Sequence, residues 1–372
     1  MNFSSTGRND ATVDDASPIV PSNQRMVWLD AAKGLSILLV AFHHAELTAT
    51  SIGEDWAGFD RLSAFFQPIR MPLFFLISGM LAASAVSKSW RELAQSKIAY
   101  FLYLYGLWST IIWICYSFIG PDGGRYTTGS SVKQLITMWI IPISGTWFLW
   151  LLAIYFVLAK CLNQVKSVFT FILLVVFTTV AVEVFLYFPH SSWRSMLIYA
   201  PFFVGGLWYS RYIVKYLPRY VSIAFPLVAI LYYAAINYVG LDFVQGSSEQ
   251  APAVRLTLSA IGLILGLGAA FLLSRLSVVR EQLAFLGRNT LSIYLAHGII
   301  MTAVAFGLSQ FSLPPSSPLW MTPLLLLIAL PASLGIRYAL GQFGDRWLYS
   351  SKGFFGLTSE ILDRITPRLA QR

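Results

Sequence analysis

Long apolar runs alternate with short polar segments along the whole chain. Ten of these runs approach the roughly 20 residues that a helix needs to cross the hydrocarbon core of a bilayer. We therefore predict an all-α polytopic membrane protein, a bundle of about ten transmembrane helices. The predicted spans are 28–48, 65–86, 99–119, 145–162, 168–188, 195–213, 220–240, 253–274, 283–307 and 320–340.

The apolar runs occupy residues 25–349, which we treat as one transmembrane domain. Residues 1–24 are polar and lack the basic-then-apolar pattern of a cleaved signal peptide, so we expect a disordered cytoplasmic tail there. Residues 350–372 are expected to form a second cytoplasmic tail. Composition agrees with a membrane protein, because 56% of the residues are hydrophobic, 15% are aromatic and only 12% are charged.

The distribution of basic residues predicts the orientation of the chain. With the N-terminus inside, 20 of the 26 Lys and Arg residues fall in cytoplasmic segments. This positive-inside bias places both termini in the cytoplasm. It also accounts for the net charge of +9 without a nucleic-acid partner. Cys115 and Cys161 lie near opposite membrane faces in this topology, so we expect neither a disulfide nor a metal site.

The first predicted span has ionisable residues at both of its ends. Asp30 and Lys33 open it, and His43, His44 and Glu46 close it. Ionisable groups inside a membrane are costly, and by default they face a protein interior or a wet cavity. Eleven residues make three helical turns plus about 20°, so Lys33 and His44 share one face roughly 16 Å apart. His43 points about 80° away from that face.

Other spans place polar residues near the depth of His44, in the outer half of the bundle. His297 lies at a similar depth in the ninth span, and Tyr294 lies one turn below it. The remaining residues at this level are Glu183 in the fifth span, and Arg70 and Trp147 at the outer ends of the second and fourth spans. We expect these side chains to converge if the helices form a bundle.

Each of these residues also has a purely structural interpretation. A histidine in a span can be a packing residue whose hydrogen bonds are satisfied, and Glu183 can be an ordinary buried carboxylate. Arg70 can be an end residue that snorkels to the interface. Asp30 can simply neutralise Lys33, three residues away, and Glu46 can be solvated at the outer surface. The residue pattern alone leaves these alternatives open.

Four motifs, in order along the chain, resemble those of the acyltransferase family 3 membrane proteins. They read WLDAAKGLSILLVAFHH from Trp28, RMPLFFLISGML from Arg70, WFLWLLAIYFVL from Trp147 and FLGRNTLSIYLAH from Phe285. The resemblance covers about residues 25–349 and points to the branch of fucose 4-O-acetylase-like enzymes. Members of the family typically carry Arg or Lys, then ten residues, then His, and Lys33 and His44 fit this spacing. Many members have arginine at the first position, so Lys33 places the chain in a subgroup.

The resemblance implies an O-acyltransferase in the bacterial inner membrane. Such an enzyme transfers an acyl group, usually acetyl, from cytoplasmic acetyl-CoA to a hydroxyl of a glycan. The acceptor would be an envelope or extracellular polysaccharide or its lipid-linked precursor. Acyl-CoA is then a donor substrate, and we expect no permanently bound cofactor and no metal. The expected partners are acyl-CoA, the glycan acceptor and membrane lipid.

The resemblance also suggests roles for individual residues. His44 would act as general base on the acceptor hydroxyl, or would form a transient acyl-histidine. Lys33, with Asp30 beside it, would hold the coenzyme phosphates at the cytoplasmic mouth. Supporting roles fall to Glu183 or Glu46, which would orient the imidazole; to His297, Tyr294 or Asn289, which would donate hydrogen bonds to the oxyanion or the sugar; and to Arg70 and Trp147, which would contact the substrate.

Two other classes of function are compatible with the same spans. Buried ionisable residues in a ten-helix bundle also suit a transporter or flippase for a glycolipid or a small solute. The sequence has no convincing inverted repeat, which weighs against that class. A regulatory membrane partner without activity is a third class, and the intact spacing of Lys33 and His44 argues against it.

Overall fold

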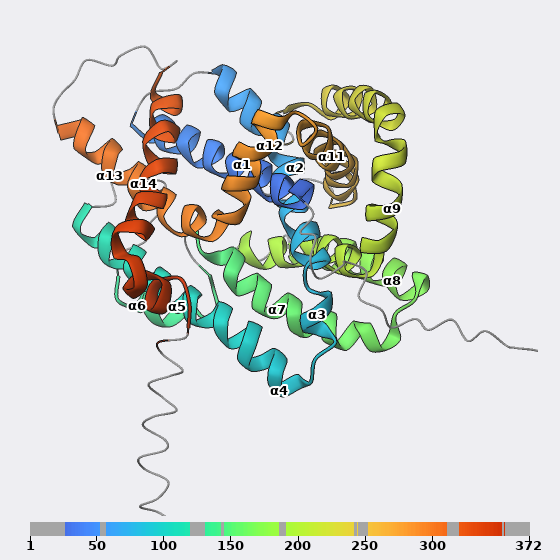
Figure 1. The fold of residues 1–372 in the computed structure, drawn as a ribbon, viewed down its shortest axis with the longest axis horizontal. Coiled ribbons are helices and arrows are strands. Elements are labelled where there is room, and N and C mark those ends of the chain that lie inside the picture. Colours follow the sequence, from blue (N-terminus) through green and yellow to red (C-terminus); the bar gives the residue numbers. More distant parts are fainter. Residues whose placement is uncertain are drawn as a thin grey trace, which may run out of the picture.

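The described part of the chain folds into helices and contains no strand (Figure 1). The computed structural model describes residues 27–52, 57–119, 131–142, 145–185, 191–241, 244, 252–310, 320–351 and 353. The predicted all-α class is therefore confirmed. The predicted tail at 1–24 lies outside the described residues, and so does nearly all of the predicted tail at 350–372.

The main helices follow one another along the chain with short connections. The long ones are α1 (Val27–Ser51), α2 (Ala57–Met80), α5 (Ala99–Ile119), α7 (Trp147–Leu162), α8 (Val168–Phe185), α9 (Ser191–Val239), α11 (Pro252–Leu273), α12 (Ser277–Arg288), α13 (Thr290–Gln310) and α14 (Met321–Phe343). The short ones are α3 (Ala83–Val86), α4 (Trp90–Leu93), α6 (Lys133–Thr137), the π-helical turns η1 (Ala94–Ile98) and η4 (Gly344–Leu348), and the 3-10 turn η3 (Asn163–Val165).

Seven stretches of the described helices are long and apolar enough to cross a membrane. They are Gly58–Met80, Trp90–Ile119, Trp147–Val165, Trp193–Val239, Pro252–Leu273, Thr290–Leu308 and Met321–Leu348. α8 is apolar but slightly shorter. α1 has the length of a span with 25 residues, but its charged residues and histidines make it less hydrophobic. The protein is thus an integral multi-pass membrane protein.

Three predicted span boundaries differ from the structure. The spans predicted at 195–213 and 220–240 form one continuous helix, α9, which curves along the right-hand side of Figure 1. The span predicted at 283–307 is interrupted at Asn289, where the short helix α12 ends and α13 begins. The span predicted at 65–86 begins earlier and ends at Met80, because α2 runs from Ala57.

Aromatic side chains fill the core between α2, α7 and α9. Phe75 of α2 is fully buried and lies 4.7 Å from Phe148, 5.1 Å from Tyr155 and 5.3 Å from Tyr199, measured between ring centroids. α2 and α9 approach closely because glycines stand where they cross. A methyl group on Gly206 would lie 2.1 Å from the carbonyl oxygen of Leu76. Small residues at a crossing let the backbones of membrane helices meet.

α1 lies in the middle of the bundle, in contact with α2, α11, α12, α13 and α14 (Figure 1). Its packing on α12 again depends on glycine. A methyl group on Gly34 would lie 1.9 Å from the carbonyl oxygen of Leu283, and one on Gly287 would lie 1.8 Å from that of Asp30. This contact fixes the first half of α1, so the histidines near its other end are held at a defined place against α13.

α5 is tied to the last described turn of the chain. Tyr103 donates a hydrogen bond of 2.9 Å to the carbonyl of Trp347, and the indole of Trp108 donates one of 2.7 Å to that of Leu348. Tyr100 similarly donates to the carbonyl of Tyr349 at 3.2 Å. Since α5 forms one wall of the site described next, these bonds fix that wall relative to η4.

Candidate functional site: a buried histidine pair

Two histidines from different helices share a small cavity inside the bundle. His44 of α1 and His297 of α13 both line it, and their ring centroids are 5.1 Å apart with an interplanar angle of 64°. The cavity has a volume of about 30 Å³, which is room for about one or two water molecules. The other lining residues are Ile112, Tyr116, Gly145, Tyr294, Leu295, Gly298 and Ile299.

His297 is buried, with 2% of its surface exposed, and its two ring nitrogens have different surroundings. Its Nδ1 lies 2.8 Å from the carbonyl oxygen of Ile293, one turn earlier on α13. A carbonyl can only accept, so Nδ1 carries the proton of this bond. In the neutral ring Nε2 is then unprotonated. Nε2 is buried and has no hydrogen-bond partner among the described residues. The neutral ring can therefore accept a proton or a hydrogen bond at the cavity, but cannot donate one there.

The neighbouring histidine, His43, is bonded elsewhere. Its Nδ1 lies 2.9 Å from the hydroxyl of Ser63 on α2 and 3.7 Å from Oε2 of Glu46. Glu46 is buried, and the hydroxyl of Thr50 donates to its other oxygen at 3.2 Å. Glu46 thus lies beside His43, and the orienting role predicted for it applies to His43 in this geometry.

Arg70 is buried beside this group on α2. Its Nη1 donates hydrogen bonds of 3.5 Å to both the carbonyl and the hydroxyl oxygen of Ser63. Its own carbonyl accepts a bond of 2.8 Å from Ser36 of α1. Arg70 is therefore no snorkelling end residue. It adds a positive charge inside the bundle and, through Ser63, belongs to the same hydrogen-bonded group as His43.

Lys33 and Asp30 form an ion pair at the opposite end of α1. Their Nζ and Oδ1 atoms are 2.9 Å apart, Asp30 is buried, and Lys33 keeps part of its side chain exposed. Neither residue lines the histidine cavity. Asn289 also lies away from it, because its amide donates 2.9 Å to the carbonyl of Phe285 where α12 ends. It lies eight residues before His297, roughly 12 Å lower along α13.

The remaining predicted residues lie at different distances from the histidines. Tyr294 lines the cavity, and its hydroxyl accepts a hydrogen bond of 3.2 Å from the backbone N–H of Phe148. Trp147 does not line the cavity but stacks on Tyr199 with centroids 6.2 Å apart. Glu183 is exposed on α8, a helix that packs on α9 and α11 and lies far from α13 in Figure 1. The structure therefore does not bring Glu183 to the histidine pair.

Two residues at the site were missed by sequence reasoning. Tyr116 of α5 lines the cavity, and its hydroxyl lies 3.3 Å from that of Thr302 on α13. This pair closes the cavity between the two helices. Ser63 connects His43 to Arg70 but has no sequence signal beyond being a polar residue on a predicted helix. No spacing rule pairs helices that are distant in sequence, so only the packing reveals these contacts.

The described residues hold no group of three or more His, Cys, Asp or Glu side chains that could bind a metal ion. The chemistry available at the cavity is instead that of imidazole, with a buried guanidinium nearby. Together with the fold, this defines a multi-pass membrane protein with a histidine site inside its helix bundle. The chain belongs to the family described as "Acyltransferase domain", whose sequence model matches residues 26–340. It is a membrane acyltransferase.

Two relatives agree with this assignment in different parts of the chain. The inner membrane protein YcfT of Escherichia coli is 24% identical over 309 residues, which cover 75% of this chain and 80% of that protein. The nodulation protein NolL of Mesorhizobium japonicum is 30% identical over 148 residues, 38% of this chain and 37% of that relative. No solved structure matches the chain.

Proposed function

We propose that this protein is an O-acyltransferase that moves an acyl group, acetyl in the first instance, from cytoplasmic acyl-CoA to a glycan hydroxyl. The acceptor is an envelope or extracellular polysaccharide, or its lipid-linked precursor, and the location is a bacterial inner membrane. The observation that carries this proposal is the pair His44 and His297 on one buried cavity, with Nε2 of His297 lacking a partner among the described residues.

The reaction needs a base, and the cavity supplies imidazole. The acceptor hydroxyl gives its proton to an imidazole nitrogen as its oxygen bonds to the thioester carbonyl carbon. The tetrahedral intermediate then breaks its carbon–sulfur bond, and the leaving thiolate takes the proton back from the imidazolium. We assign the base to His44 and propose that Nε2 of His297 accepts a hydrogen bond from His44 or from the acceptor. The Arg70 guanidinium adds a positive potential that favours the developing oxyanion.

The donor approaches from the end of α1 that carries Lys33. The coenzyme phosphates stay in water at that mouth, where Lys33 attracts them. Asp30 holds the ammonium in place at 2.9 Å. The uncharged pantetheine arm spans the roughly 16 Å between Lys33 and His44 along α1. A cavity of about 30 Å³ is too small for a thioester and a sugar together, so α1, α5 and α13 separate when substrates bind.

The test is acetyl-CoA turnover by the purified protein in proteoliposomes, with host envelope glycan as acceptor. We expect His44→Ala to lower glycan-dependent thioester loss by about 100-fold or more, the range of a general base. His43→Ala is the matched control, because His43 is adjacent in sequence but does not line the cavity. Its loss should be clearly smaller.

Equal losses in the two variants, with unchanged thermal unfolding, would contradict the assignment of His44. Transport is the competing activity, and a transporter or flippase would move glycolipid or solute without consuming acetyl-CoA. Absence of any thioester loss in the wild type, together with measurable flux, would therefore refute the proposed function itself.

A further inference from the structure

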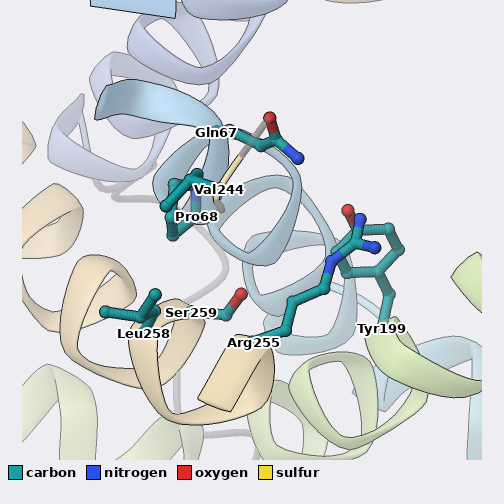
Figure 2. A pocket seen from close by; sticks show the side chains of 7 residues that line it. All are labelled: Gln67, Pro68, Tyr199, Val244, Arg255, Leu258 and Ser259. Atoms are coloured by element: carbon teal, nitrogen blue, oxygen red, sulfur yellow. The ribbon is translucent and has the colours of Figure 1, made fainter. Parts of the chain in front are cut away.

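A second polar pocket lies between α2, α9 and α11 (Figure 2). It is lined by Gln67, Pro68, Tyr199, Val244, Arg255, Leu258 and Ser259, and we call it the Arg255 pocket. Figure 2 shows Arg255 extending from α11 towards Tyr199, with Ser259 one turn further along the same helix. The enclosed volume is about 10 Å³. That is room for about one water or one ligand oxygen, so the pocket can hold one group of a larger ligand.

Four polar side chains converge on this pocket without a protein partner. Ser259 is 3% exposed and Tyr199 is 7% exposed, yet neither hydroxyl forms a hydrogen bond with any residue that the structure describes. The amide of Gln67 and the guanidinium of Arg255 likewise have no hydrogen bond or ion pair there. Buried polar groups are nearly always bonded, so each exception calls for an explanation. Four exceptions around one pocket indicate a binding site.

The chemistry of these groups specifies the ligand. Arg255 presents a planar set of N–H donors that matches a carboxylate or phosphate. Gln67, Ser259 and Tyr199 can each donate and accept, which suits sugar hydroxyls. None of the seven lining residues is acidic. Arg194, in the first turn of α9, lies close enough to Arg255 for their charges to interact and adds to the positive potential.

The pocket adjoins the histidine site through two elements. Tyr199 stacks on Trp147 at an interplanar angle of 27°, and Trp147 follows two residues after Gly145, which lines the histidine cavity. On α2, Gln67 lies one turn before Arg70, whose partner Ser63 contacts His43. Gln67, Tyr199 and Arg255 all lie in the first halves of their helices, at the end of the bundle where α1 finishes and α2 starts.

We propose that the Arg255 pocket binds the oxyanion, a carboxylate or a phosphate, of a polyhydroxylated acceptor whose neutral hydroxyl is acylated at the histidine cavity. This inference rests on the proposed acyl transfer for the identity of the ligand as acceptor. Arg255 forms the charged contact, and Gln67, Ser259 and Tyr199 bind flanking hydroxyls. The acceptor is then an acidic glycan or a glycan on a lipid diphosphate, and neutral glycans bind weakly.

Binding is measured with the full chain in nanodiscs, independently of turnover. The probes are a uronic acid oligosaccharide, a neutral oligosaccharide of equal length and a polyprenyl diphosphate sugar. We expect Arg255→Gln to raise the Kd of one of the two anionic probes by about 10- to 100-fold and to leave that of the neutral probe within about threefold. Arg255→Lys should lie between wild type and Gln, because it keeps the charge but loses the planar fork. Ser259→Ala should raise the same Kd by a smaller factor.

Arg61→Gln is the matched control. Arg61 is an exposed arginine near the start of α2, outside the pocket, so its loss removes the same charge from the same end of the bundle. If Arg61→Gln weakens the anionic probes as much as Arg255→Gln does, the effect is general electrostatics and the proposal fails. It also fails if Arg255→Gln changes no anionic Kd while the variant unfolds at the wild-type temperature.

Two further results separate the possible explanations. Loss of tightly bound phosphatidylglycerol in Arg255→Gln, with unchanged glycan binding, would assign the pocket to a lipid headgroup and overturn the proposal. If the wild type transfers no acyl group but still binds an anionic glycan through Arg255, the binding site stands and the proposed acyl transfer fails. Binding and turnover therefore report separately on the two claims.

Discussion

His297 uses one ring nitrogen to bond its own helix and leaves the other at the cavity. The bond from Nδ1 to the carbonyl of Ile293 fixes both the ring orientation and the tautomer. The role predicted from sequence was a hydrogen-bond donor, and a neutral ring with this tautomer is an acceptor at Nε2. Sequence spacing placed His297 and His44 at one depth, but a tautomer depends on a local bond that no spacing reveals.

We expect His297→Asn to fold like the wild type and to lose acyl transfer by about 100-fold. The asparagine amide can still donate to the carbonyl of Ile293 but has no atom at the position of Nε2. His297→Gln is the companion variant, because its longer amide reaches towards that position and should restore part of the activity if Nε2 only accepts a hydrogen bond. Turnover with intact thermal unfolding is the measurement, and full activity of the asparagine variant would show that Nε2 is dispensable.

Glu46 shows what helix geometry can and cannot decide before a structure exists. Residues three apart lie side by side on a helix, and residues two apart do not. This rule already favours His43 over His44 as the neighbour of Glu46, in agreement with the 3.7 Å contact. The link from His43 to Ser63 joins two helices, and nothing local in the sequence could identify it.

At the scale of helices, the hydropathy pattern found most spans but misjudged some of their connections. The polar segment 211–219 between two apolar runs predicted a turn, and the structure keeps it helical inside α9. That segment contains no glycine, and Pro218 bends the helix without ending it. Asn289 has the opposite effect, because it ends α12 inside one predicted span. Whether a helix continues or stops was decided by packing, which the pattern does not contain.

The crossing of α2 and α9 offers a matched pair of adjacent glycines. A methyl group on Gly206 would lie 2.1 Å from the carbonyl oxygen of Leu76, whereas one on Gly205 would lie 3.4 Å from the ring of Phe171. Gly206→Ala should therefore cost about 1–3 kcal/mol by overpacking, and Gly205→Ala should cost much less. Thermal unfolding in detergent measures the difference. Equal unfolding temperatures for the two variants would show that the helices can separate at little cost.

At the scale of the whole molecule, the distribution of charge predicts an orientation that the two cysteines can test. Cys161 is exposed near the end of α7, and Cys115 is half-buried near the end of α5. The predicted topology puts Cys161 on the cytoplasmic side. A Cys115→Ser variant should therefore react with a membrane-impermeant maleimide in inside-out vesicles and stay unlabelled in right-side-out ones. The reverse pattern would invert the bundle, and with it the assignment of donor and acceptor sides.

The small size of both enclosed spaces has a consequence for the membrane itself. A protein that draws its donor from one side and its acceptor from the other risks becoming a proton leak, because a continuous file of water conducts protons across the bilayer. The spaces at the histidine pair and at Arg255 measure about 30 and 10 Å³, and the stacked rings of Trp147 and Tyr199 lie between them. In this closed form the rings interrupt such a file. The bundle can thus expose its histidines to substrates from both compartments while the proton gradient that powers the cell is preserved.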